Sequence, residues 1–155
     1  MPSPIYVLNG PSLNLLGTRE PEVYGRATLA DIERLTADHA KTYGLEIVFR
    51  QTNHEGVMVD WIQEGREKAS GLILNAAAFT HTSIAVYDAL RVFDKPIIEV
   101  HLSNPQKREQ FRRHSYVSLA ATGVILGFKE QGYVMAIDAM AKLIGSGANE
   151  RRRSN

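Results

Sequence analysis

The sequence contains no cysteine among its 155 residues. Disulfide bridges and thiolate metal ligands are therefore excluded. No apolar run approaches the roughly 18 residues that a membrane-spanning helix needs. The N-terminal Met-Pro-Ser-Pro lacks the basic and apolar regions of a secretory signal. These absences predict a protein that does not cross a membrane and resides in the cytoplasm.

Several cofactor and nucleotide motifs are also missing. There is no Gly-x-Gly-x-x-Gly fingerprint, no Gly-Lys-Ser/Thr phosphate loop, no His-x-x-x-His or acidic cluster with metal-ligand spacing, and no Gly-x-Ser-x-Gly nucleophile elbow. The net charge is only +1, and the sole basic cluster is at 151–153, so the basic face that nucleic acid requires is absent. We expect no metal, no organic cofactor and no nucleic-acid partner.

Strand-like and helix-like segments alternate along the chain, which is 44% hydrophobic and of a length typical for one domain. The predicted strands are 5–8, 45–49, 71–74, 96–100 and 124–126, and the predicted helices are 29–43, 58–69, 84–91 and 133–144. Thr28 is placed to cap the first helix and Gly44 to end it.

Strands that alternate with helices form right-handed βαβ units and a parallel sheet. Most of these strands are continuous apolar runs, as expected when helices cover both faces of the sheet. We therefore predict a flavodoxin-like α/β fold, a doubly wound five-stranded parallel sheet in three αβα layers. A single catalytic domain is expected over 1–146, followed by a flexible basic tail at 147–155.

A long connection follows the first strand and extends to about Arg26. Loops of this length inside a compact domain are usually functional. The segment carries Arg19 and Tyr24 between Gly17 and Gly25, which could act as hinges of a lid closing on a substrate. An ordinary surface loop remains the alternative.

Polar residues follow four of the five predicted strands. In open α/β sheets, ligands bind beyond the carboxyl ends of the strands. The polar residues found there are Asn9, Asn53-His54-Glu55, Asn75 and Glu99 to Ser103, whereas the fifth strand ends in Gly127-Phe128. The sequence thus predicts a binding site along this rim.

Two residues at the fourth strand form the best candidate for acid–base chemistry. His101 ends a buried strand, and Glu99, two residues earlier, points to the same side. A carboxylate there would orient and charge the imidazole, making it a proton donor.

The other rim residues have two interpretations each. Asn75 is either a turn residue or a partner for a substrate hydroxyl. His81 and His54 either cap helices or face the site. Arg19, Arg108 and Arg112 could each bind a carboxylate, although Arg112-Arg113 could also be a solvated pair. This residue set suits cofactor-free acid–base chemistry on a small anionic, hydroxylated substrate.

The chain resembles the type II 3-dehydroquinate dehydratases in several independent motifs, in order, over about residues 5–144. They are Asn9-Gly10-Pro11, Leu13-Asn14-Leu15-Leu16-Gly17, Arg19-Glu20-Pro21, Tyr24-Gly25, Gln51-Thr52-Asn53-His54-Glu55-Gly56, Asn75 with Thr80-His81-Thr82-Ser83, Glu99-Val100-His101-Leu102-Ser103-Asn104, Phe111-Arg112-Arg113-His114-Ser115-Tyr116 and Gly132-Tyr133.

The resemblance implies a flavodoxin-like enzyme without metal or organic cofactor. It implies a cytoplasmic homododecamer, a tetramer of trimers. The substrate would be 3-dehydroquinate, which loses water through an enolate to give 3-dehydroshikimate, in the shikimate pathway or in quinate breakdown.

The resemblance also assigns roles to residues. Tyr24 would be the base, His101 the acid, and Arg19 would assist Tyr24. The substrate would be held by Asn75, His81, Arg112 and the backbone of Leu102 and Ser103, while Asp88 would reach a neighbouring subunit's site. The family usually has Asn where this chain has Ser12, whose hydroxyl can still donate a hydrogen bond, directly or through water. The family's Pro and small residue after Asn75 are replaced by Ala76-Ala77.

Two other functions remain as alternatives. One is a non-catalytic flavodoxin-like module that carries a nucleotide or flavin, which the missing phosphate loop disfavours. The other is an assembly paralogue without activity, which the presence of Tyr24, Arg19 and His101 together disfavours.

Overall fold

The computed structural model describes residues 2–18 and 20–153, with side chains described up to residue 145. Five parallel strands form one sheet in the order β2-β1-β3-β4-β5. The strands are β1 Ile5–Asn9, β2 Ile47–Gln51, β3 Gly71–Asn75, β4 Ile97–His101 and β5 Gly123–Leu126. The predicted flavodoxin-like fold is thereby confirmed.

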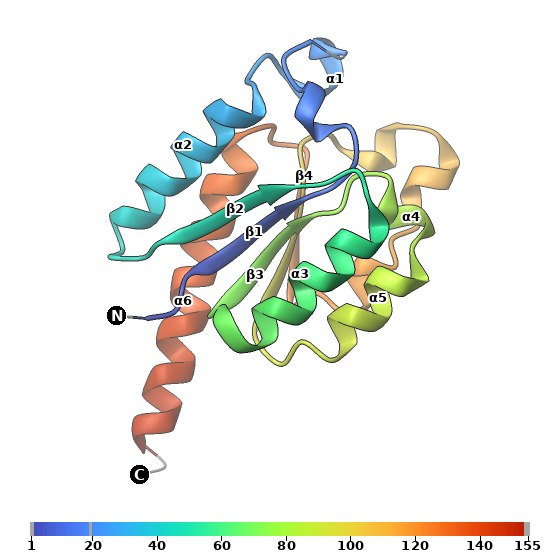
Figure 1. The fold of residues 1–155 in the computed structure, drawn as a ribbon. Coiled ribbons are helices and arrows are strands. Elements are labelled where there is room, and N and C mark those ends of the chain that lie inside the picture. The colour runs from blue at the N-terminus through green and yellow to red at the C-terminus, as the bar shows by residue number, and fades with distance from the viewer. Residues whose placement is uncertain (1, 19, 154–155) are drawn as a thin grey trace.

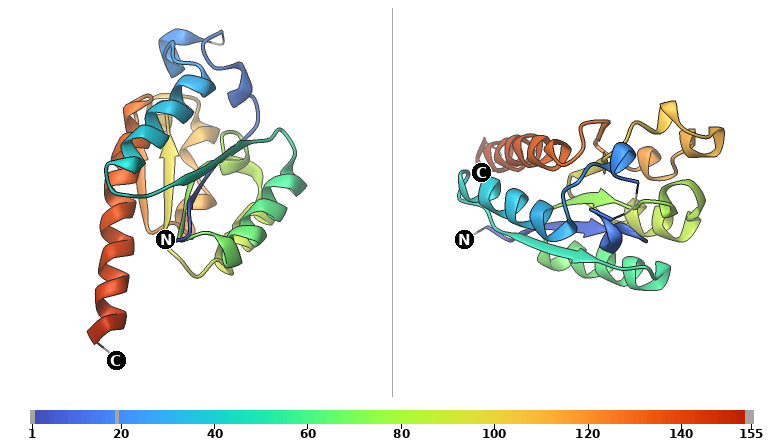
Figure 2. Two further views of the ribbon diagram at one scale, coloured as in Figure 1. Left: turned by 60° about the vertical axis from the view of Figure 1, so that its left-hand side comes forward. Right: turned by 90° about the horizontal axis from the view of Figure 1, so that it is seen from above.

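Helices cover both faces of this sheet (Figure 1). The long ones are α2 Leu29–Lys41, α3 Glu55–Lys68, α5 Ile84–Arg91 and α6 Gln131–Arg153. Helices α2 and α6 pack together on one face, and α3 and α5 pack together on the other (Figure 2). No helix in the described part of the chain has both the length and the apolar character needed to cross a bilayer.

The alternation of side chains along β1 explains why the sheet has two cores. Ile5 and Val7 belong to the cluster under α2 and α6, whereas Tyr6 and Leu8 belong to the cluster under α3 and α5. All five residues of β1 are buried, as are those of β3 and β4. The edge strands β2 and β5 are less buried, so the middle three strands form the buried centre of the sheet.

Helix α2 begins at Leu29, as the sequence predicts, but ends at Lys41, two residues before the predicted end at 43. Thr28 and Asp31 form a capping box, in which each side chain accepts a hydrogen bond from the other's backbone N–H, at 3.1 and 3.0 Å. Gly44 follows the helix with a φ of 69°, a backbone conformation that glycine adopts at little cost.

The last helix differs from the prediction. It was expected over 133–144 with a tail from 147, but α6 continues to Arg153 and extends beyond the sheet (Figure 1). The predicted boundary at 146 therefore falls inside a helix. Gly145 and Gly147 each disfavour helix by about 1 kcal/mol relative to alanine, but without proline they do not block its propagation. Flexibility of the segment stays a prediction.

The connection after β1 is also more ordered than a plain loop. It contains the 3₁₀ turn η1 at Leu13–Leu15 and the short helix α1 at Pro21–Tyr24. Gly10 lies so close to β3 that a Cβ there would be 2.2 Å from the Ala76 carbonyl oxygen. Gly17 and Gly25 both have a φ of 91°, so each adopts a conformation that other residues disfavour. Their role as hinges stays a prediction.

Lys95 precedes β4 at the end of the sheet opposite the rim. Its Nζ donates hydrogen bonds to the carbonyl oxygens of Arg66 and Ala69 at 2.6 Å, and to that of Gly65 at 3.4 Å. These carbonyls belong to the C-terminal turn of α3, where a cation is favoured. Lys95 thus tethers α3 to the start of β4.

We expect Lys95→Met to lower the free energy of unfolding by about 1–2 kcal/mol, because the carbonyls lose a charged donor. Urea denaturation would measure the change, with Lys41→Met, at an exposed lysine, as the control. A variant as stable as the parent protein would contradict this role for Lys95.

Candidate active site

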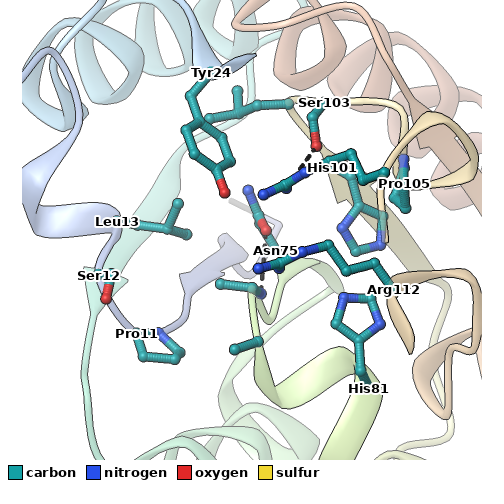
Figure 3. Close-up of a pocket in the computed structure, with 14 residues that line it drawn as sticks. Pro11, Ser12, Leu13, Tyr24, Asn75, His81, His101, Ser103, Pro105 and Arg112 are labelled. Atoms are coloured by element: carbon teal, nitrogen blue, oxygen red, sulfur yellow. Dashed lines mark hydrogen bonds between the residues drawn. The ribbon is translucent and has the colours of Figure 1, made fainter. Parts of the chain in front are cut away.

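A pocket with a cavity of about 100 Å³ lies at the carboxyl edge of the sheet (Figure 3). Residues from seven separate parts of the fold meet there. They are Pro11, Ser12, Leu13, Tyr24, Asn75, Ala77, Ala78, His81, His101, Leu102, Ser103, Pro105, Arg108 and Arg112. The rim predicted from the strand ends is therefore the site of the pocket.

The structure brings together most of the predicted site residues. Eight of them line the pocket, namely Ser12, Tyr24, Asn75, His81, His101, Leu102, Ser103 and Arg112. Glu99 lies behind His101, and Asp88 is exposed on α5, outside the lining of this pocket. Arg19 lies outside the described residues.

Glu99 and His101 form a buried, hydrogen-bonded pair at the end of β4. The side chain of Glu99 is 1% exposed and that of His101 is 10% exposed. The Glu99 carboxylate accepts hydrogen bonds from His101 Nε2, from Ser118 Oγ and, at 2.8 Å, from Ser115 Oγ. Since Nε2 is committed to Glu99, Nδ1 is the ring nitrogen left for a ligand.

The environment keeps Glu99 ionised. Burial acts to raise its pKa, but the hydrogen bonds and charge of His101, with the hydrogen bonds of Ser118 and Ser115, outweigh burial and lower the pKa from its usual value. Stability from this pair is therefore complete above the ordinary pKa of a glutamate and is lost as the pH falls through the lowered value.

His81 lies in the short helix α4, Phe79–Thr82, and its ring points into the pocket (Figure 3). Its Nδ1 is 2.7 Å from the carbonyl oxygen of His114. A carbonyl can only accept, so Nδ1 carries the proton and Nε2 is an acceptor in the neutral ring. Burial lowers the pKa of His81 against the effect of the His114 carbonyl, and His101 and Arg112 lower it further. The ring is therefore neutral near pH 7 and can accept a hydroxyl proton.

Asn75 is held from two sides at the end of β3. It is 3% exposed. Its Nδ2 donates to the hydroxyl oxygen of Tyr133 at 3.0 Å, and its Oδ1 accepts from the backbone N–H of Ala77 at 3.2 Å. Ala77 reaches this position with a φ of 52°, in the left-handed region.

Two arginines from the segment after β4 line the pocket. Arg112 is 20% exposed and donates from Nε to Glu109 at 2.5 Å, whereas Arg113 is exposed. The solvated-pair interpretation therefore fits Arg113 and not Arg112. Arg108 donates to Ser103 Oγ at 3.2 Å, and its guanidinium carbon is 5.0 Å from the centre of the Tyr24 ring. The sequence singled out Arg108 only as one of three possible carboxylate partners.

Some predicted rim residues do not face the pocket. Asn9 is fully buried and bonds to Tyr133 and to the Arg50 carbonyl. Asn53 accepts hydrogen bonds from the Ser12 backbone and from Gln51, both at 3.0 Å, and so supports the loop. His54 stands at the N-cap of α3, but its side chain makes no cap hydrogen bond. Among the described residues, no group of three or more His, Asp or Glu side chains could hold a metal ion.

Sequence reasoning missed the role of Tyr133. It was noted in a matching motif but given no function, although a tyrosine on a buried helix face needs a partner for its hydroxyl. The need for a hydrogen-bond partner was therefore the sequence signal that could have pointed to Tyr133.

Comparisons with known proteins agree with this geometry. The sequence matches the family model described as Dehydroquinase class II over residues 3–141. It is 59% identical over 143 residues to the 3-dehydroquinate dehydratase of Phenylobacterium zucineum, covering 92% of this chain and 99% of that protein. It is 56% identical over 144 residues to the 3-dehydroquinate dehydratase of Caulobacter vibrioides, covering 93% and 99%.

A solved structure shows the same similarity. The crystal structure of type II dehydroquinase from Propionibacterium acnes superposes with a TM-score of 0.88 at 41% identity, covering 92% of this chain and 98% of that one. The shared fold, the matching length and the family motifs lead to one assignment: this chain belongs to the class II dehydroquinase family.

Proposed function

We propose that this chain is a hydro-lyase that converts 3-dehydroquinate to 3-dehydroshikimate in the shikimate pathway. Its family and its relatives named 3-dehydroquinate dehydratase support the reaction. The observation that carries the mechanism is that a tyrosine hydroxyl and an imidazole backed by a carboxylate enter one pocket (Figure 3). A base and an acid in one small pocket are what elimination of water needs.

Tyr24 is the proposed base. Elimination β to a ketone begins with loss of the C2 proton, which leaves an enolate. A tyrosine hydroxyl ionises near pH 10, so the active tyrosinate needs a nearby cation. The Arg108 guanidinium carbon lies 5.0 Å from the centre of the Tyr24 ring, and Arg19, on the same connection as Tyr24, is proposed to supply the cation that favours the tyrosinate.

His101 is the proposed acid. When the enolate collapses, its carbonyl re-forms and a new double bond forms between C1 and C2, while the C1–oxygen bond breaks. Hydroxide is a poor leaving group, so His101 donates a proton from Nδ1 and the group departs as water. Glu99 stabilises the imidazolium through Nε2. Tyr24 carries the proton taken from C2, and the cycle closes when both residues regain their starting protonation states.

The remaining pocket residues are proposed to bind the substrate. Arg112 and the backbone at Leu102 and Ser103 would bind the carboxylate, since a guanidinium and backbone N–H groups suit an anion. His81, with Nε2 as an acceptor, and Asn75 would bind ring hydroxyls. Ser12 would contribute a hydroxyl donor near the enolate, directly or through water.

We infer that the active form is a cytoplasmic homododecamer, a tetramer of trimers. Asp88 supports a shared site because it is exposed on α5 and does not line the pocket of its own chain. From there it is available to a neighbouring subunit, where it would position Arg19 through a charge-assisted hydrogen bond.

We expect Tyr24→Phe to lower kcat by about 10²–10⁴-fold, because the general base is lost. KM should change little, since the ring still fills its space. Absorbance of the conjugated product would measure the rate, with Tyr43→Phe, at an exposed tyrosine bonded to Asp138, as the matched control. Retention of more than about a tenth of the parent kcat would exclude Tyr24 as the base.

We expect Glu99→Gln to lower kcat by about 10–100-fold, less than the roughly 10²–10⁴-fold expected for loss of an acid itself. The amide removes the negative charge that stabilises the imidazolium but leaves His101 in place. Steady-state kinetics would compare it with Glu67→Gln, at an exposed carboxylate on α3. A change in KM alone would show that Glu99 acts on binding instead.

We expect Asp88→Ala to lower kcat/KM by about 10–100-fold, the cost of one charge-assisted hydrogen bond. Sedimentation analysis of the parent protein should give a mass near twelve times 17.2 kDa. Asp94→Ala, at an exposed aspartate just after α5, is the control. A fully active monomer would refute both the assembly and the shared site.

A further inference from the structure

A buried chain of hydrogen bonds runs beneath the pocket and ends at Asn75. Asn9 Nδ2 donates to the Arg50 carbonyl oxygen at 3.0 Å, Tyr133 Oη donates to Asn9 Oδ1 at 2.6 Å, and Asn75 Nδ2 donates to Tyr133 Oη at 3.0 Å. The chain connects β2, β1, α6 and β3. We propose that Tyr133 is a positioning residue that fixes the Asn75 amide for ligand binding.

The Arg50 carbonyl, at the end of the hydrogen-bond chain farthest from Asn75, sets the donor and acceptor roles of the groups along it. The Arg50 carbonyl can only accept, so Asn9 must turn Nδ2 toward it and present Oδ1 to Tyr133. The Tyr133 hydroxyl has one proton, and it goes to Asn9. Only a lone pair is left for Asn75, which must therefore turn its Nδ2 to Tyr133.

The other end of the Asn75 amide enforces the same orientation. The Ala77 N–H donates to Oδ1. A flipped amide would face this N–H with its own NH₂ group and would lose the bond to Tyr133 as well. With one N–H bound to Tyr133, the second N–H of Asn75 is the donor that remains for a ligand.

The burial of these groups shows that the arrangement is costly to leave incomplete. Tyr133 and Asn9 are 0% exposed, and Asn75 is 3% exposed. Buried polar groups without partners are destabilising, so the loss of either hydrogen bond to Tyr133 would leave a buried amide group of Asn9 or Asn75 without that partner. Phenylalanine differs from tyrosine only by the hydroxyl, so Tyr133→Phe keeps the ring whose centre lies 6.4 Å from that of Phe49.

This inference rests on the proposed function, since Asn75 is proposed to bind the substrate. A double-mutant cycle separates positioning from a purely structural role. We expect Tyr133→Phe to raise KM for 3-dehydroquinate by about 3–10-fold, the loss expected when one neutral hydrogen bond is misplaced. In the Asn75→Ala background the same change should alter KM by less than about twofold, because the residue on which Tyr133 acts is absent.

Tyr6→Phe is the matched control. Tyr6 is also buried, 3% exposed, and its hydroxyl bonds to Glu64 far from the pocket. The Tyr6→Phe variant should lose thermal stability, as Tyr133→Phe should, but its KM should equal that of the parent protein. Equal KM effects of Tyr133→Phe in both backgrounds, or an equal rise with Tyr6→Phe, would overturn the proposal.

A second variant tests the direction of the chain with the tyrosine intact. Asn9→Ala frees the Tyr133 proton to point at Asn75, so KM should again rise by about 3–10-fold. Exchange of the Asn75 side-chain amide protons, followed by NMR without substrate, should be faster in both variants. Unchanged KM and unchanged exchange would refute the proposal. An inactive parent protein would instead refute the proposed function, while the exchange result would still stand.

Discussion

The register of the three central strands is the constraint on which the site depends. β1 and β3 are paired so that Asn9 lies beside Asn75, and β3 and β4 so that Leu74 lies beside Glu99. Because side chains alternate, Asn75 points to the α6 side of the sheet while Glu99 and His101 point to the α5 side. The pocket combines them only because it lies at the edge, where both faces are accessible. A shift of one residue in the β3–β4 pairing would turn the side chains of one strand to the opposite face relative to the other, and would lose this arrangement of acid and amide.

Much of the fold followed from local patterns in the sequence. The five strands and the Thr28 cap were predicted, as was a glycine turn at Gly44 after the helix, because each depends on residues close together in the chain. The residues at the strand ends located the pocket, because a parallel sheet places all of its carboxyl ends at one edge. The predicted end of the last helix was wrong, because two glycines lower helix propensity without preventing a helix from forming.

The finer arrangement of the site could not be predicted in the same way. Asn9 and Asn75 look alike in the sequence, as polar residues that end apolar strands. Both bond to Tyr133, which lies 58 residues beyond Asn75 on the α6 face of the sheet, but only Asn75 lines the pocket. The contact of Arg108 with the Tyr24 ring likewise joins two segments far apart in the chain. Such contacts depend on tertiary packing, which periodicity does not encode.

The close approach at Gly10 has a consequence for how the pocket can vary. The loops that follow β1 and β3 meet there, with no room for a side chain between Gly10 and the Ala76 carbonyl, and Gly10 also donates its N–H to the Asn75 carbonyl at 2.8 Å. The loop after β1 and the loop after β3, which form two walls of the pocket, are therefore held together at Gly10. A movement of the loop after β1 that leaves β3 in place must therefore begin after Gly10. A change in the backbone of one loop at this contact requires a matching change in the other loop. The two loops consequently form a single unit of variation.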